Sequence, residues 1–169
     1  MMLLQKACGV VVMATLLTGH GASAQDSRLA DQAVLKTIDA LVSAMNKNDD
    51  RAIAALMTAD AVMQDEIAPY RWLGPNAEAK WSHDDAQLIA KRGVTQSHSS
   101  RGVPTFVHRT ATHAFATVPL VYTYMLGGRP QRETGLWTIV FAKSGPTWQI
   151  TFLGFAKVSD TSDATWNGQ

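Results

Sequence analysis

Two adjacent acids, Asp65 and Glu66, are the side chains in this sequence best suited to moving a proton on a bound molecule. They close a short β-rich run from Ala61 to Glu66, and an aromatic-rich loop from Pro69 to Pro75 follows. A carboxylate works as a general base near neutral pH when burial raises its pKa. Because neighbours in a strand point to opposite faces, we expect one of the two acids to face solvent. The pattern therefore predicts one candidate base and argues against a pair of working carboxylates.

Aromatic residues in this loop and on later segments form the second candidate group. Together their rings suit the wall of a pocket for an apolar or aromatic ligand, with hydroxyl and indole groups as orienting donors. Each ring taken singly is better explained by packing in a hydrophobic core. The aromatic candidates for ligand binding are Tyr70, Trp72, Trp81, Tyr122 and Trp137, and Tyr124 shares a strand face with Tyr122.

The histidines and serines do not show the spacing of a metal site or of a hydrolase triad. His83, His98, His108 and His113 lack the spacing of a metal site, such as i, i+4 on one helix, so we expect no metal and no cofactor. We retain His98 as a candidate ligand-binding residue and acid–base partner of the base. The serines around it do not form the G-x-S-x-G elbow of a hydrolase, so a hydrolase triad is not expected.

Hydrophobic periodicity predicts helices in the first half of the domain. From Asp31 to Met45 apolar residues recur on one helical face, and a short second helix follows, capped by Asp49 or Asp50. A third helix opens at Pro75, where a missing N–H costs nothing. Asp84 falls on the same stripe of that helix as Trp81, so it is either a second acid at a cavity mouth or a surface acid paired with a base.

After Gly93 the apolar period changes from 3.6 to 2, which predicts strands. Pro119 lacks a ladder donor and so implies a bulge or a sheet edge. Helices followed by an antiparallel meander indicate the α+β class. The expected strands are Thr95 to His108, broken near Gly102 to Pro104, then His113 to Met125, Glu133 to Lys143 and Trp148 to Val158.

The N-terminus has the pattern of an export signal. Lys6 precedes an apolar run from Ala7 to Leu17, and Ala22-Ser23-Ala24 fits the small-x-small rule for cleavage. That run is too short to span a bilayer, so we expect no stable membrane insertion after cleavage. We therefore predict a cleaved signal at 1–24, one domain at 25–158, a polar tail at 159–169, and a periplasmic or secreted protein.

Composition excludes several classes of function. Cys8, the only cysteine, lies inside the predicted signal, so the mature chain has no disulfide, thiolate nucleophile or cysteine metal site. Without Lys6 the basic residues number the same as the 14 acidic ones. No basic stripe is left to hold phosphates, so nucleic acid is not an expected partner.

The layout from Asp31 to Val158 resembles the nuclear transport factor 2-like superfamily, which includes the SnoaL-like proteins and the ketosteroid isomerases. The run from Leu41 to Asp65 is similar, without a gap, to the ketosteroid isomerase pattern, and Pro69 to Pro75 resembles a subgroup of exported members. The resemblance implies a cone-shaped, curved antiparallel sheet wrapped around three N-terminal helices, with an apolar pocket inside. It also implies a homodimer formed through the outer face of the sheet.

The resemblance singles out Asp65 as the carboxylate that moves a proton next to a ketone. It also places Leu41 where the isomerases keep a tyrosine donor, and Trp137 where they keep a protonated acid. An enolate would lose those donors, which are worth several kcal/mol each, so steroid isomerisation is not expected. If Asp65 has no role in chemistry, it is an ordinary acid at a strand end whose carboxylate accepts hydrogen bonds from N–H groups of the loop.

Three functions remain open on the sequence. The first is an exported single-domain protein that binds a small, largely apolar ligand in its cavity. The second is a cofactor-free enzyme of isomerase or lyase type with Asp65 as base. The third is a dimeric interaction module, because fold alone does not give function.

Overall fold

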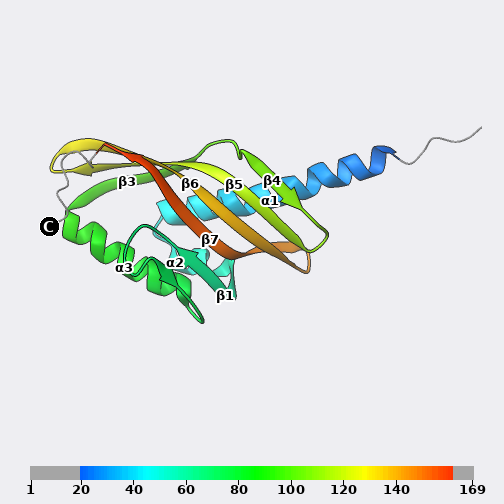
Figure 1. The fold of residues 1–169 in the computed structure, drawn as a ribbon, viewed down its shortest axis with the longest axis horizontal. Helices are drawn as coiled ribbons and strands as arrows, with labels where there is room; N and C mark the ends of the chain where they lie inside the picture. Colours follow the sequence, from blue (N-terminus) through cyan, green and yellow to red (C-terminus); the bar gives the residue numbers. More distant parts are fainter. Residues whose placement is uncertain (1–19, 162–169) are drawn as a thin grey trace, which may run out of the picture.

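The structure, a computed structural model, describes residues 20–161. Most of the predicted signal segment and the tail from residue 162 lie outside the described residues. Three helices and seven strands build one α+β domain with a curved sheet, in the order α1 (His20–Asn46), α2 (Asp50–Ala55), β1 (Met57–Gln64), β2 (Arg71–Trp72), α3 (Ala77–Arg92), β3 (Val94–Arg101), β4 (Phe106–Arg109), β5 (His113–Leu126), β6 (Arg129–Ser144) and β7 (Thr147–Asp160) (Figure 1).

The first two helices form where the apolar spacing predicts them. In α1 the stripe Val34, Ile38 and Leu41 is fully buried and packs into the core below the sheet. The described part of this helix includes residues 25–29. Asp49 caps α2, because its carboxylate accepts a hydrogen bond from the Ala52 N–H at 2.9 Å.

The sheet runs in the order β2-β1-β7-β6-β5-β3, with β4 also paired to β5. The expectation of an all-antiparallel sheet is wrong at one pair, since β1 lies parallel to β7, with Met63 opposite Leu153. A parallel pair requires a long crossover, and here most of the domain lies between the two strands. The sheet is therefore mixed, while the β5-β6-β7 meander is antiparallel as predicted.

Pro119 lies inside β5, which has neighbours on both sides. Its carbonyl oxygen accepts a hydrogen bond from the Gly102 N–H at 2.8 Å. Gly102 lies between the end of β3 at Arg101 and the start of β4 at Phe106. The imide nitrogen faces that same gap, because the N and C=O of one antiparallel residue point to one side. The proline therefore occupies a gap between two partner strands, and no ladder donor is lost there.

Irregular registers bend the long strands around the core. The pairing of β6 with β7 shifts between Thr134 and Gly135 and again between Val140 and Phe141. A side chain on Gly135 would collide with the ring of Phe155, so this position needs glycine for a close approach. The strand β7 continues to Asp160, two residues past the predicted end of the domain at Val158.

Alternation along β6 separates the two faces of the sheet. Trp137, Ile139 and Phe141 are buried against the helices, and the residues between them are half-buried. Across residues 20–161, none of the helices combines the length and apolarity needed to cross a bilayer.

Candidate active site

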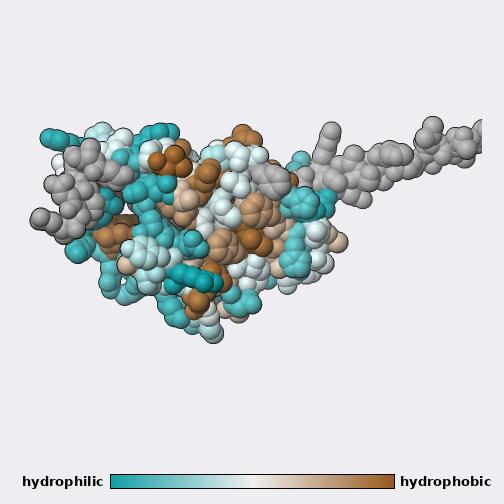
Figure 2. Space-filling model, in the orientation of Figure 1, coloured by the Kyte–Doolittle hydropathy of each residue, from teal (hydrophilic) through white to brown (hydrophobic). Residues whose placement is uncertain are grey.

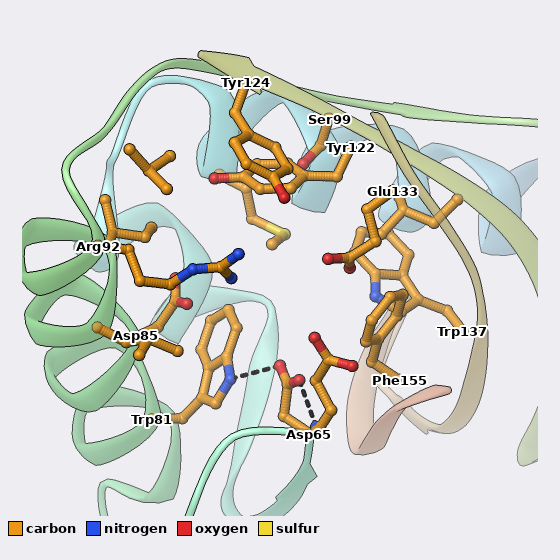
Figure 3. Close-up of a pocket in the computed structure, with 16 residues that line it drawn as sticks. Asp65, Trp81, Asp85, Arg92, Ser99, Tyr122, Tyr124, Glu133, Trp137 and Phe155 are labelled. Atoms are coloured by element: carbon orange, nitrogen blue, oxygen red, sulfur yellow. Dashed lines mark hydrogen bonds between the residues drawn. The ribbon is translucent and has the colours of Figure 1, made fainter. Parts of the chain in front are cut away.

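A cavity of about 120 Å³ opens between α3, the end of β1 and the concave face of β5, β6 and β7 (Figure 3). Its walls are mostly apolar, but they also carry charged and hydroxyl side chains. The aromatic lining residues are Trp81, Tyr122, Tyr124, Trp137 and Phe155. The polar lining residues other than tyrosine are Asp65, Glu66, Asp85, Arg92, Ser99 and Glu133.

Asp65 sits in the turn that follows β1, with both carboxylate oxygens held. Oδ2 accepts a hydrogen bond from the indole Nε1 of Trp81 at 2.9 Å, and Oδ1 accepts from the Glu66 N–H at 2.6 Å. Burial raises the pKa of Asp65, while the two hydrogen bonds lower it in part. The result is a carboxylate of fixed orientation at the edge of an apolar cavity.

Glu66 lines the same cavity, which contradicts the expectation that one of the two acids faces solvent. The alternation rule does not apply because β1 ends at Gln64, before either acid. Lys157 Nζ lies 3.2 Å from Glu66 Oε2. Burial raises the pKa of Glu66 more than Lys157 lowers it. The cavity therefore holds two adjacent acids, of which one is paired with a lysine.

Glu133, which the sequence analysis did not select, faces the cavity from β6. It lies directly opposite Tyr122 in the pairing of β5 with β6, and only 8% of its surface is exposed. Burial, and then the negative charge of Glu66, raises the pKa of Glu133 to about 8. A signal for it was present, because Glu133 shares the strand face of Gly135 and Trp137.

The wall formed by α3 carries Trp81, Asp85 and Arg92 at helical spacing. Burial, and then the charge of Asp65, raises the pKa of Asp85 to about 6. Asp84, the acid proposed from sequence for this wall, instead accepts a hydrogen bond from Trp72 Nε1 at 2.7 Å and does not line the cavity. Residues three and four positions after Trp81 are both its neighbours on a helix, so the pattern alone does not separate them.

Two tyrosines close the side of the cavity formed by β5. The rings of Tyr122 and Tyr124 lie with centroids 5.1 Å apart, and the guanidinium of Arg92 is 5.9 Å from the Tyr124 ring centre. The Tyr124 hydroxyl donates to Asp160 at 3.0 Å. Burial raises the pKa of the Tyr122 hydroxyl, and the neighbouring Ser97 lowers it in part. The Tyr122 hydroxyl therefore holds its proton more strongly than that of an exposed tyrosine.

The structure brings some of the predicted site residues together and separates the others from them. Asp65, Trp81, Tyr122 and Trp137 line one cavity. Tyr70 does not, since it is 62% exposed in the loop after β1.

The remaining two predicted residues also lie outside the cavity lining. Trp72 is buried, but its indole is bonded to Asp84. His98 is exposed, while its neighbour Ser99 lines the cavity, as does Val94 of the same strand. A register shift between Thr95 and His98 decides which residues of β3 face inward.

The arrangement can perform acid–base chemistry. One oriented carboxylate, Asp65, faces a mostly protonated carboxyl, Glu133, across a small cavity. Groups whose pKa values are pushed apart by their environments can act as base and acid at one pH. Residues 20–161 contain no group of three or more His, Cys, Asp or Glu placed to hold a metal ion.

Comparisons with known proteins identify the fold. No protein-family model matches the chain, and no curated protein matches it in sequence. Among solved structures, the hexachlorocyclohexane dehydrochlorinase of Novosphingobium barchaimii superposes with a TM-score of 0.69 at 12% identity, over 82% of this chain and 92% of that one. A nuclear transport factor 2-like protein of Salmonella enterica gives 0.65 at 15% identity, over 85% and 98%.

A ketosteroid isomerase-like protein of Erwinia carotovora gives a TM-score of 0.60 at 19% identity, over 76% of this chain and 95% of that one. At these identities the likeness establishes architecture and not activity. The fold predicted from the sequence, the α+β cone of nuclear transport factor 2-like proteins, is confirmed.

Proposed function

We propose that this protein, which has the fold of the nuclear transport factor 2-like proteins, is a cofactor-free enzyme that removes a proton from a small, largely apolar molecule. Asp65 is the base. The observation that carries the proposal is the Asp65 carboxylate itself, buried at the cavity wall with Oδ1 and Oδ2 each fixed by one hydrogen bond. Fixed orientation makes proton removal effectively intramolecular once a ligand is bound.

The pKa of Asp65 supports a role as base. A base works best when its pKa lies near the working pH, and burial moves Asp65 in that direction. The two hydrogen bonds favour the ionised carboxylate and so lower the pKa in part, but burial outweighs them. Asp65 is therefore more basic than an exposed aspartate.

The size of the cavity limits the ligand. About 120 Å³ is close to the roughly 150 Å³ of an engineered cavity that holds benzene. The ligand is thus one small ring or a chain of similar volume, not a steroid. Proteins of the same fold support the class of chemistry: one is named a dehydrochlorinase, whose reaction removes hydrogen and chlorine, and another is named as isomerase-like.

A generic proton-transfer substrate tests the proposal without knowledge of the natural one. A benzisoxazole loses its ring C–H proton to a base, the N–O bond breaks, and a coloured cyanophenolate forms. The protein should open this ring faster than the same concentration of acetate does, and Asp65→Asn should reduce the rate at least about tenfold, as expected for loss of a general base.

Asp84→Asn is the matched control, because Asp84 also accepts from a tryptophan indole but lies outside the cavity lining. It should keep the rate of the unchanged protein. A rate no higher than that of acetate, or equal losses in the two variants, would overturn the proposal. Thermal unfolding of both variants separates a lost base from a lost fold.

Binding without turnover is the second candidate function, and one observation favours it. Leu41, which takes the place of the isomerase donor, is fully buried in the apolar core and has no proton to give. A binding protein would hold small aromatic molecules with unchanged affinity in Asp65→Asn, and it would release them chemically unaltered. Calorimetry together with mass spectrometry of the recovered ligand separates the two functions.

A further inference from the structure

We propose that the molecule held in this cavity is a small organic cation, an ammonium group on an apolar body, with its charged nitrogen against Glu133. The inference rests on the proposed function only in placing the ligand in this cavity. It names the chemical class that the lining selects.

Acidic side chains outnumber basic ones in the cavity lining. Four carboxyl groups line it, from Asp65, Glu66, Asp85 and Glu133, against one guanidinium, from Arg92. Arg92 and Asp85 both come from the α3 wall, on the opposite side of the cavity from Glu133 (Figure 3). An apolar cavity with surplus carboxylates has a negative potential, which favours a cation over an anion.

Glu133 is a carboxyl group of the cavity lining that is available to bind a ligand. Its side chain is buried to 8% exposure and points into the cavity, yet it makes no hydrogen bond or ion pair with any side chain of the described residues. Lys157 is the nearest candidate partner by charge, but its ammonium pairs with Glu66. A donor on the ligand would supply the hydrogen-bond partner that this carboxyl group lacks among the described side chains.

The rings around Glu133 complete a site for a cation. Figure 3 shows its carboxyl group between Tyr122 on one side and the rings of Trp137 and Phe155 on the other. Aromatic faces attract an ammonium group, most strongly where water is excluded. Tyr124 already holds the guanidinium of Arg92 in this way, at 5.9 Å. Rings and an unpaired acid together recognise a charged nitrogen attached to an apolar body.

Binding of a cation should release a proton. In the empty cavity Glu133 is mostly protonated at neutral pH. An ammonium group beside it favours the carboxylate, so the carboxyl proton leaves to solvent as the ion pair forms. Below about pH 8 the affinity should therefore rise with pH, by up to about tenfold per unit. The charged or titratable groups that face Glu133 are Asp65, Glu66, Lys157, Asp160, Tyr122, Tyr124, Asp85 and Arg92.

Three probes of one size and three charges test the proposal: benzylammonium, benzyl alcohol and benzoate. Isothermal titration of the purified protein near neutral pH should give benzylammonium the highest affinity, about tenfold or more above benzyl alcohol, with benzoate the weakest. The affinity for benzylammonium should rise between about pH 6 and about pH 8, while that for benzyl alcohol should not.

Variants of Glu133 test whether this side chain causes the preference for the cation over the alcohol. Glu133→Gln should bring the affinities for benzylammonium and benzyl alcohol to within about threefold of each other. Glu133→Asp, which keeps a carboxyl group, should retain part of the difference between them. Glu78→Gln is the matched control, because Glu78 is also buried, at 6% exposure, but outside this cavity. It should leave the preference unchanged. If Glu133→Gln does not fold, the probe series and its pH dependence in the unchanged protein decide.

Each other outcome overturns the inference. Equal or tighter binding of benzyl alcohol would mean that Glu133 donates its proton to a neutral oxygen, and tightest binding of benzoate would mean that Arg92 selects the ligand. Absence of binding by all three would remove the cation site as well. None of these results depends on turnover of the benzisoxazole, so failure of the inference is distinguishable from failure of the proposed proton transfer.

Discussion

The indole Nε1 of Trp81 donates a hydrogen bond to Oδ2 of Asp65 at 2.9 Å, which ties α3 to the turn after β1. The same kind of bond joins Trp72 to Asp84 at 2.7 Å, on the same helix but outside the cavity. One tryptophan–aspartate pair thus positions a candidate base, while the other fastens the loop onto α3. The two pairs provide matched variants for separating a role in chemistry from a role in structure.

Trp81→Phe should move the pH range in which Asp65 acts as a base to higher pH. The substitution keeps an aromatic ring but removes the indole donor, and that donor lowers the pKa of Asp65. The pKa of Asp65 should rise, so the acidic limb of the pH–rate profile for benzisoxazole opening should move to higher pH. Trp72→Phe should leave the limb in place. An unchanged limb in Trp81→Phe would show that this hydrogen bond does not tune the base.

Gly135→Ala should destabilise the fold and alter the cavity. The added methyl group would overlap the ring of Phe155, which lines the cavity. Overpacking of this kind costs about 1–3 kcal/mol in the free energy of unfolding. The double variant Gly135→Ala/Phe155→Ala should remove the overlap, so its loss should be smaller than the sum of the single losses. Denaturant unfolding of the four proteins measures this coupling, and strict additivity would contradict it.

The sequence predicted the elements better than the site. Periods of 3.6 and 2 placed the helices and strands, and Asp65, the predicted base, lies in the cavity lining together with Glu66, which was expected to face solvent. Asp85 was missed because residues three and four after Trp81 are equivalent until the direction of the cavity is known. His98 was chosen over Ser99 because the register shift near Gln96, whose φ is 51°, cannot be read from an alternating pattern. Choices that depend on the packing of distant elements therefore require the structure.

Glu133→Gln should make the stability of the fold less sensitive to pH between about pH 5 and about pH 8. The pKa of Glu133 is about 8 in the folded state, above the roughly 4.3 of an exposed glutamate, so between these values the folded state holds a proton that the unfolded state has lost. Stability then falls as pH rises, by up to about 1.4 kcal/mol per unit for this one group. Urea unfolding between about pH 5 and about pH 8 should show a shallower decline in Glu133→Gln than in the unchanged protein. If the free energy of unfolding fell equally with pH in both proteins, the result would contradict the burial of a protonated acid at this position.

The outer face of the sheet should hold two copies of the chain together. Phe115, Val140 and Phe152 lie side by side in the register of β5, β6 and β7, and Leu136 lies next to Ala156 on the same face. Figure 2 shows hydrophobic side chains gathered over these strands. A contiguous apolar sheet face of this kind is typical of an interface.

Sedimentation at micromolar concentration should therefore give a dimer, and Val140→Lys should give a monomer that retains the unfolding curve of a folded domain. The lysine charge would have to be desolvated at the centre of the interface, which costs several kcal/mol when no acid pairs with it. Lys143→Ala is the control, because it changes a residue of β6 near the strand end and outside the apolar group. A monomer in the unchanged protein would contradict the dimer and leave the apolar group as ordinary half-buried sheet surface.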